Sequence, residues 1–365
     1  MRLCQGVGFN RISNKRGQDD LSTPSIGFIG PRPIIIALAA AYPQHFVGQA
    51  LRLAFLCGDD TYSQQNFDHR RQWILDRMKQ LTDVFSIKIA SYAIMSNHYH
   101  IIVRIDRDQA LLWSDDEVTD RWLALFSGNV MINRWRSGAR LSKAEELVVK
   151  KVIETWRKRL YDLGWFMRCL NEHIARLANH EDGCSGRFWE GRYKSQALLD
   201  EKALLTCMSY VDLNPIRANI AKTPEASDFT SVQERIRGFS QARRSSKKET
   251  KLKLSHLVEF GGNESSSRPE NTISFHLDDY IALVDWTGRA IRTDKRGSIP
   301  QNLAPVFERL NMTSDDWLTA ISKASHAYGL AKGPITRLKE YAERIGRQWI
   351  RGQSYCEVFY RFAPD

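Results

Sequence analysis

The sequence predicts an α+β fold in which an antiparallel sheet carries helices on one face. Two β-rich runs, 86–95 and 99–105, follow each other closely enough to form a hairpin. Apolar residues at helical spacing precede the hairpin over 67–85, and a further strand and helix are expected over 192–214. This βαββ…βα order is typical of an antiparallel sheet with helices packed against it.

The region before the hairpin is expected to hold a tail, a strand and a helix. Residues 1–32 mix Gly, Ser, Asn, Arg and Pro without periodicity, which predicts a flexible basic N-terminal tail. Residues 44–53 suggest the first strand. Asn66 is expected to cap a helix that should lie on the sheet. That helix places apolar side chains on one face: Phe67, Ile74, Met78, Leu81 and Phe85.

The hairpin turns at Ser96-Asn97, a good turn pair. Side chains alternate along a strand, so His98 and His100 are expected to point to the same face of the sheet. Ile102 and Arg104 fall on that face as well. The opposite face receives Tyr99, Ile101 and Val103, so one face of this strand is apolar and the other is polar at its start.

The rest of the chain is predicted to be mainly helical. Residues 107–182 are rich in helical patterns, a strand follows at 192–199, and a helix runs from Asp200 to about Asn214, where Pro215 should end it. The domain prediction is one domain over 33–238 with a helical insertion at about 107–160. A Ser-, Lys- and Arg-rich linker at 239–271 and a helical C-terminal module at 272–365 follow it.

Composition restricts the function classes. The chain has 365 residues and 42% hydrophobic content, enough for a substantial core. Its 53 Lys and Arg outnumber 42 Asp and Glu, a net charge of +11, which favours a polyanionic partner without requiring one. Six cysteines without a Cys-x-x-Cys pair argue against a zinc ribbon or a disulfide framework. The apolar run at 34–41 is too short to span a bilayer, so a cytoplasmic protein without a membrane anchor is expected.

Two groups of side chains suggest chemistry. His98 and His100 could share one cation, although a histidine pair one residue apart also arises by chance as half-buried strand residues. Tyr210 and Asn214 are neighbours on one helical face, beside the stripe formed by Leu204, Met208 and Val211. A tyrosine there is often an amphipathic residue at a core edge, and an asparagine before proline is often a C-cap.

Together these groups would supply a metal site and a covalent nucleophile. A phenol attacks a phosphodiester poorly at neutral pH unless the phosphate is polarised, which a divalent ion held by His98, His100 and the Asn214 carbonyl oxygen would do. The ester energy would be kept in a phosphotyrosine, so resealing needs no nucleotide. The chain accordingly lacks a Gly-x-x-x-x-Gly-Lys-Ser/Thr loop.

Residues 186–194 interleave aromatic and basic side chains, a mixture suited to single-stranded DNA. The alternative is a loop that packs Phe188 and Trp189 into the core while its charges stay in water. Glu190 could orient a histidine or the metal from a second layer of contacts.

Three motifs together resemble the REP-associated tyrosine transposases of bacteria, single-tyrosine members of the HUH nuclease superfamily. They are Tyr92-Ala93-Ile94-Met95-Ser96-Asn97-His98-Tyr99-His100, Gly186-Arg187-Phe188-Trp189-Glu190-Gly191-Arg192-Tyr193-Lys194, and Tyr210-Val211-Asp212-Leu213-Asn214-Pro215-Ile216-Arg217-Ala218. The resemblance covers roughly 43–235. It implies a ferredoxin-like sheet, the HUH nuclease fold, and does not account for residues 240–365.

The resemblance also implies roles for single residues. His98 and His100 would be metal ligands with Asn214 as the third, the metal would be Mg²⁺ or Mn²⁺, and Tyr210 would be the nucleophile that forms a 5′-phosphotyrosine and leaves a free 3′-hydroxyl. The expected DNA contacts are Arg187, Trp189, Arg192, Tyr193, Lys194 and Arg217.

The expected function is therefore metal-dependent cleavage and rejoining of single-stranded DNA next to REP-like palindromic hairpins, by a monomer or homodimer. Two alternatives stay open: a domesticated DNA-binding regulator of the same fold without catalysis, and a replication or mobilisation initiator. The single tyrosine and the lack of a helicase motor make the initiator the weaker of the two.

Overall fold

A computed structural model gives the structure of the protein. It describes residues 34–40, 56–60, 64–244, 255–262, 272–291, 307–308, 310, 312–323, 329–350, 356 and 360. The predicted N-terminal tail and the strand predicted at 44–53 lie outside these residues.

Five strands form the main sheet, in the order β4-β5-β1-β6-β7. They are β1 (Ile34–Ala40), β4 (Ile87–Ile94), β5 (His98–Ile105), β6 (Lys194–Leu198) and β7 (Ala331–Lys332), and β2 (Asp59–Asp60) pairs separately with β3 (Gln65–Asn66). Neighbours are antiparallel except β6 and β7, which are parallel. The short apolar run near the N-terminus is thus the central strand, and central strands often read as continuous apolar runs without alternation.

The predicted hairpin is confirmed. β4 and β5 pair antiparallel, and the Met95 amide donates to the His98 carbonyl at 2.8 Å, which leaves Ser96 and Asn97 as the turn. The predicted alternation along β5 is confirmed too, because Tyr99, Ile101 and Val103 join one hydrophobic core and Ile102 joins another.

One face of the sheet is covered by α1 (Arg70–Val84) and α6 (Leu163–Glu181). Ile74, Met78 and Leu81 of α1 are fully buried there, as the helical spacing predicts. The predicted cap is wrong, because α1 begins at Arg70. The Asn66 side chain instead accepts from the Asp68 amide at 2.9 Å, an Asx turn that precedes the helix.

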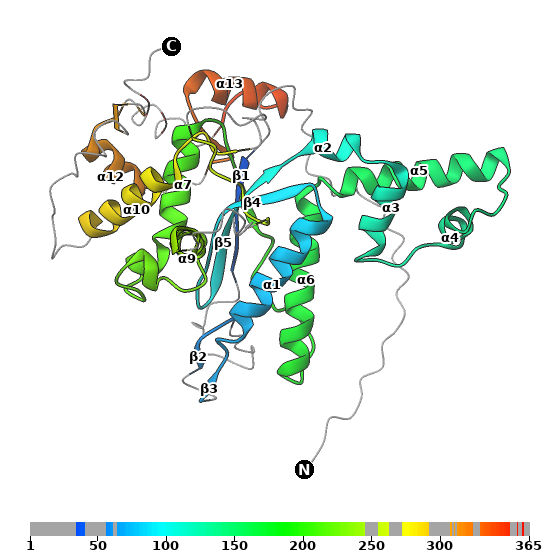
Figure 1. Cartoon of the computed structure of the whole chain (residues 1–365), viewed down its shortest axis with the longest axis horizontal. Helices are drawn as coiled ribbons and strands as arrows, with labels where there is room; N and C mark the ends of the chain where they lie inside the picture. The colour runs from blue at the N-terminus through cyan, green and yellow to red at the C-terminus, as the bar shows by residue number, and fades with distance from the viewer. Residues whose placement is uncertain are drawn as a thin grey trace.

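The prediction of helices on only one face is wrong, because a second helical layer covers the other. It contains α7 (Glu201–Asp212), α8 (Asn214–Arg217), α9 (Ser231–Arg244), α10 (Leu277–Ile291) and α12 (Ser314–Lys323), with the 3₁₀ turn η1 (Pro224–Ala226). Figure 1 shows α7, α10 and α12 on one side of the strands and α1 and α6 on the other. Pro215 separates α7 from α8 only slightly, because it lies in the first turn of α8 and Asn214 is itself helical.

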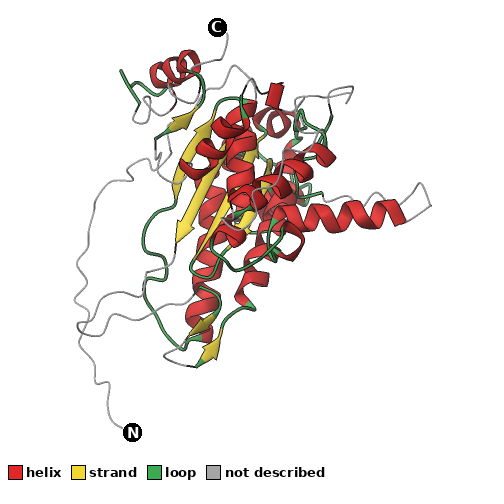
Figure 2. Ribbon diagram, turned by 90° about the vertical axis from the view of Figure 1, so that its left-hand side faces the viewer, coloured by secondary structure: helices red, strands yellow, loops and turns green. Residues whose placement is uncertain are grey.

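The region 107–160 is helical, as predicted. It forms α2 (Arg107–Leu112), α3 (Asp115–Leu123), α4 (Val130–Arg136) and α5 (Lys143–Arg159). Ser142 begins α5 with a capping box, since its hydroxyl accepts from the Glu145 amide and the Glu145 carboxylate accepts from the Ser142 amide. Figure 1 shows α5 extending away from the sheet. Figure 2 gives the view turned by 90°.

Described parts of residues 239–365 form hydrogen bonds to the sheet, which a solvated linker and a separate helical module would not do. Within the predicted linker, α9 continues to Arg244, Leu257 and Val258 are buried, and the Val258 amide donates to the Ile89 carbonyl of β4 at 2.7 Å. Beyond it, β7 extends the sheet before α13 (Ile335–Arg344). The described part of the linker is therefore not a solvated segment, and the domain boundaries stay a prediction. No helix among the described residues is long and apolar enough to span a membrane.

Candidate functional site

Two elements about 110 residues apart in sequence bring a tyrosine beside the histidine pair. His98 and His100 lie at the start of β5, and Tyr210 lies in the last turn of α7 on the same face of the sheet. The ring centroids of His100 and Tyr210 are 5.9 Å apart, with the rings nearly perpendicular at 86°. We call His98, His100, Tyr210 and Arg217 the tyrosine–histidine cluster.

The two histidines point their Nε2 atoms at each other, 3.1 Å apart. The Nδ1 atom of His98 lies 2.7 Å from the Asn97 side-chain oxygen, so it donates to that oxygen and leaves Nε2 with a lone pair. Burial lowers the pKa of His98. Burial, and then the nearby His98 and Arg217, lower the pKa of His100 to about 3. Both rings are therefore neutral at physiological pH, the form in which imidazole binds a metal.

Asn214 and Arg217 come from α8, directly after the tyrosine. The Asn214 amide nitrogen donates to the carbonyl oxygens of Tyr210 and Val211, at 3.1 and 3.4 Å, which leaves its side-chain oxygen as the atom able to bind a ligand. The Arg217 guanidinium carbon lies 4.4 Å from the centroid of the Tyr210 ring. The junction of α7 and α8 thus presents the Tyr210 phenol, the Asn214 amide oxygen and the Arg217 cation.

The two histidine nitrogens are spaced to share a divalent ion, but a metal site needs further ligands. Two nitrogen ligands at adjacent positions around one ion lie roughly 3 Å apart when each bond is about 2.1 Å, which matches the spacing of the two Nε2 atoms. No group of three His, Cys, Asp or Glu side chains that could hold a metal occurs among the described residues. A third protein ligand would have to be an oxygen of another kind, and the Asn214 side chain offers one.

The aromatic and basic loop at 186–194 divides between the core and the surface. Phe188 is buried and the Trp189 indole donates to the Asn171 carbonyl at 2.9 Å, with its ring against Tyr99, on the α1–α6 face. Burial raises the pKa of Tyr193 to about 12. The charged members remain exposed: Arg187, Glu190, Arg192 and Lys194. The structure thus favours the packing alternative for the aromatic residues of this loop.

Only one residue of this loop is aligned with the histidines. Lys194 and His100 both pair with Leu38 of β1, from opposite sides, so they lie on the same face of the sheet. Glu190, predicted to orient a histidine, has no hydrogen bond or ion pair to His98 or His100 within the described chain.

Sequence reasoning missed Asp212, which fixes the end of α7. Its buried carboxylate accepts hydrogen bonds from the Ser231 hydroxyl at 2.5 Å, the Val232 amide at 3.1 Å and the Tyr280 hydroxyl at 2.5 Å. Burial raises its pKa, and the hydrogen bonds from Ser231 and Tyr280 oppose that effect. A signal was present in the sequence, because Asp212 follows Met208 by four residues and so continues the apolar stripe of the helix.

The start of α7 is fixed by a residue near the other end of the chain. Asp200 caps the helix by accepting from the Ala203 amide at 2.9 Å, and the Tyr360 hydroxyl donates to the same carboxylate at 2.7 Å. The helix that carries Tyr210 is therefore held at both ends by residues outside 43–235, the region covered by the motif resemblance.

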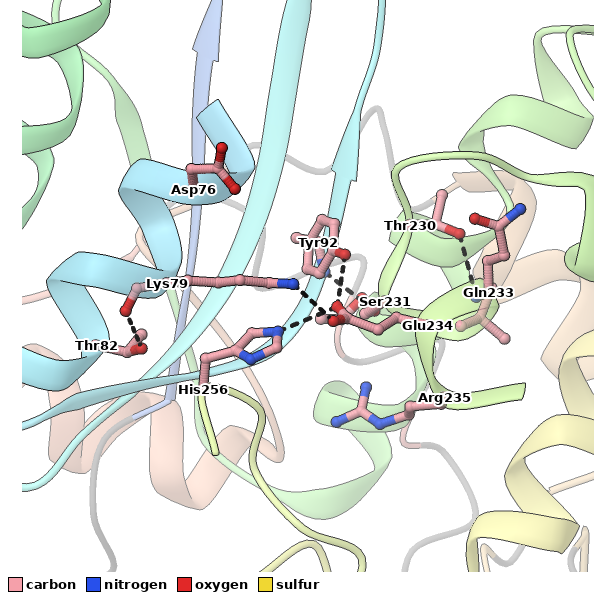
Figure 3. A network of polar contacts seen from close by, with 12 residues as sticks. Asp76, Lys79, Thr82, Tyr92, Thr230, Ser231, Gln233, Glu234, Arg235 and His256 are labelled. Atoms are coloured by element: carbon pink, nitrogen blue, oxygen red, sulfur yellow. Dashed lines mark hydrogen bonds and ion pairs between the residues drawn. The ribbon is translucent and has the colours of Figure 1, made fainter. Parts of the chain in front are cut away.

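A polar network centred on Glu234 was also missed (Figure 3). Its carboxylate accepts from the Lys79 ammonium at 2.8 Å and the Tyr92 hydroxyl at 2.8 Å, and it lies 3.1 Å from the His256 Nε2 atom. Burial alone would raise the pKa of Glu234, but the hydrogen bonds from His256 and Lys79 outweigh burial and lower it to about 2. This network joins α1, β4, α9 and the segment at 256.

Comparisons with known proteins assign no family to the chain. No protein-family model matches the chain, and no curated protein does. A solved structure of a REP-associated tyrosine transposase bound to a REP hairpin is similar over 59% of this chain and 84% of that chain. The identity is 10% and the TM-score is 0.32, so this likeness shows neither family nor function.

Proposed function

We propose that the protein is a metal-dependent enzyme that cuts and rejoins single-stranded DNA through Tyr210. The observation that carries the proposal is the position of the Tyr210 ring against His100, 5.9 Å between centroids, within one chain. A nucleophile beside two neutral imidazoles suits transfer of a phosphoryl group to a side chain. The three-motif resemblance to single-tyrosine transposases points to the same chemistry.

The proposed fold is ferredoxin-like. The antiparallel order β4-β5-β1-β6, with α1 between β1 and β4 in the chain, supports this assignment. In such an arrangement the first strand is central, which agrees with the pairing of β1 to both β5 and β6.

In the proposed reaction, the Tyr210 phenolic oxygen attacks phosphorus and forms a phosphotyrosine ester. The bond from phosphorus to the 3′ oxygen breaks, the phenol gives up its proton, and the 3′ oxygen takes one up to leave as a hydroxyl. Resealing is the reverse attack by a 3′-hydroxyl. His98, His100 and the Asn214 side-chain oxygen would hold Mg²⁺ or Mn²⁺, which when bound supplies Lewis-acid polarisation of the phosphate.

The proposed partner is single-stranded DNA next to REP-like hairpins, met in the cytoplasm. The net charge of +11 and the alignment of Lys194 with His100 on one face support a polyanionic substrate. Of the predicted DNA contacts, Lys194 and Arg217 lie on the face of the cluster, whereas Trp189 packs on the opposite face.

The test is cleavage of a labelled hairpin-flanked oligonucleotide, with a denaturing gel to detect a covalent adduct. Tyr210→Phe should abolish the adduct and reduce cleavage at least about 1,000-fold, because no other group replaces the phenolic oxygen. Tyr161→Phe is the matched control, since Tyr161 is also half-buried and lies outside the cluster. EDTA should stop the wild-type reaction. Undiminished cutting by the Tyr210→Phe protein would rule out the proposed nucleophile.

A second candidate is a DNA-binding regulator of the same fold without catalysis. It is favoured by the lack of a third His, Cys, Asp or Glu ligand near the pair within the described residues. Hairpin binding without any denaturation-resistant adduct, in Mg²⁺ and in Mn²⁺, would support this candidate over the enzyme.

A further inference from the structure

Arg217 has a buried nitrogen for which the described residues offer no hydrogen-bond acceptor. Its guanidinium lies over the Tyr210 ring, and its Nη1 atom is buried yet donates to no group in the described chain. No carboxylate among the described residues forms an ion pair with it. A buried N–H of a charged group is costly when unpaired, so such an atom calls for an explanation.

Two other arginines, Arg235 and Arg157, have buried guanidinium groups that form several hydrogen bonds each. Arg235 donates to the carbonyl oxygens of Ala90 and Val258, each at 2.9 Å. Arg157 donates to two backbone carbonyls and to the Asp115 carboxylate at 2.7 Å. The buried Nε atom of Arg71 also lacks a hydrogen bond, but it lies 3.3 Å from the Asp68 carboxylate and is compensated by that charge. Arg217 differs, because the partner of its Nη1 atom is not supplied by the described protein.

The surroundings of Arg217 select an anionic oxygen as that partner. The neighbouring groups are the Tyr210 ring and the imidazole pair, with Lys194 on the same face of the sheet. Arginine presents N–H donors in a planar fork that matches phosphate oxygens. Because Arg217 stacks on the ring that bears the reactive hydroxyl, an oxyanion bound to it lies beside that hydroxyl.

We propose that Arg217 binds a non-bridging oxygen of the phosphodiester that Tyr210 attacks. This inference rests on the proposed function and assigns to Arg217 a direct contact with the reacting group, beyond general attraction of DNA. Negative charge on the non-bridging oxygens persists through the transfer, and a fixed guanidinium stabilises it without reorganising. Stacking on Tyr210 also holds the donor and the nucleophile in one orientation.

The experiment measures single-turnover cleavage of two hairpin oligonucleotides, one with a normal scissile phosphate and one with a neutral methylphosphonate there. Arg217→Gln should slow cleavage of the normal substrate about 100- to 1,000-fold, the loss typical of removing one oxyanion donor. Its rate ratio between the two substrates should be at least about tenfold smaller than that of the wild type, because the side chain that senses the charge is gone. Equal ratios in both proteins would overturn the proposal.

Two further variants distinguish loss of the Arg217 contact from a general loss of folding. Arg217→Lys keeps the charge but not the fork, and should fall between the wild type and Arg217→Gln in cleavage of the normal substrate. Arg176→Gln removes an exposed arginine of α6 and should match the wild type in rate and ratio. If Arg217→Gln unfolds at a lower temperature, Arg217→Lys decides: because it keeps the charge, its ratio should lie nearer the wild-type ratio than that of Arg217→Gln. A ratio equal to that of Arg217→Gln would count against the phosphate contact.

Binding separates failure of this inference from failure of the proposed function. If the wild type binds the hairpin but forms no covalent adduct, the proposed enzymatic function is wrong. The affinities of the wild type and of Arg217→Gln for the same two oligonucleotides are then compared. The methylphosphonate should then weaken wild-type binding at least about fivefold and leave the affinity of Arg217→Gln unchanged. Equal weakening in both proteins, or no hairpin binding at all, would overturn the Arg217 contact.

Discussion

The two faces of the sheet differ in how they are built. On the α1–α6 face, Tyr99, Ile101 and Val103 of β5 meet apolar side chains of two helices that the sequence patterns predict. On the α7 face, the same strand presents His98, His100 and Arg104. Buried polar groups there, including Asp212 and Arg235, hold segments from distant parts of the chain together.

The difference explains where chemistry can be placed. The hydrophobic effect has no preferred direction, whereas a hydrogen bond depends on both distance and angle and leaves a costly unpaired group when it breaks. The Tyr210 helix is tied at Asp200 by Tyr360 and at Asp212 by Tyr280 and Ser231. The hydrogen bonds of the α7 face thus fix the orientation of the nucleophile's helix, and apolar burial on the α1–α6 face stabilises the sheet on which that helix packs.

The largest effect is expected at Asp212. Asp212→Ala removes the buried acceptor that Ser231, Val232 and Tyr280 share, which should lower the free energy of unfolding by about 3–5 kcal/mol. Urea unfolding followed by circular dichroism measures the loss. A change below about 1 kcal/mol would contradict the view that this carboxylate anchors the polar face.

An intermediate effect is expected on the apolar face. Leu170→Ala in α6 removes a fully buried side chain and should cost about 3 kcal/mol through lost burial and a cavity. Because the α1–α6 face does not position Tyr210, the folded variant should cleave DNA at a rate within about threefold of the wild type under the proposed function. A large loss of cleavage by a well-folded Leu170→Ala protein would contradict the view that the α1–α6 face does not position Tyr210.

The smallest effect is expected at Glu234, whose partners Lys79, Tyr92 and His256 come from different layers. Glu234→Gln should lower the free energy of unfolding by about 1–3 kcal/mol at pH 7. The pKa of Glu234 is lowered from its ordinary 4.5 to about 2, so its charge stabilises the fold above pH 4.5 and this contribution is lost as the pH falls toward 2. Unfolding curves of the two proteins should therefore converge over that range. A gap that stays constant from pH 7 to pH 2 would show that ionisation of Glu234 is not the cause.

Several elements follow from local patterns. The hairpin turn at Ser96-Asn97, the face of each β5 side chain, and the helix that starts after Asp200 are all as predicted. Each depends on residues a few positions apart, through strand alternation, turn preference or helix capping. The prediction that His98 and His100 share a face is of this kind, whereas their function stays a prediction.

Each error has its own physical cause. The central strand reads as an apolar run because helices cover both faces of the sheet, so it lacks the alternation used to recognise strands. Asn66 looks like a cap, but its side chain is already engaged by Asp68 and Asp59. The segment around Leu257 has a linker-like neighbourhood in the sequence, yet His256, Leu257 and Val258 are buried, because the edge of the sheet at β4 offers backbone partners there.

The sequence alone determined the elements near the cluster, the shared face of the two histidines and the neighbouring positions of Tyr210 and Asn214, because these depend on the fixed periods of strands and helices. Only the tertiary structure decided that Tyr210 lies against His100 and that Arg217 stacks on the Tyr210 ring with a nitrogen that no described residue pairs. It also decided that Asp212, Tyr280 and Tyr360 hold the helix. Those contacts join residues up to 160 positions apart. No local period encodes such pairs, since the path of the whole chain through space brings them together.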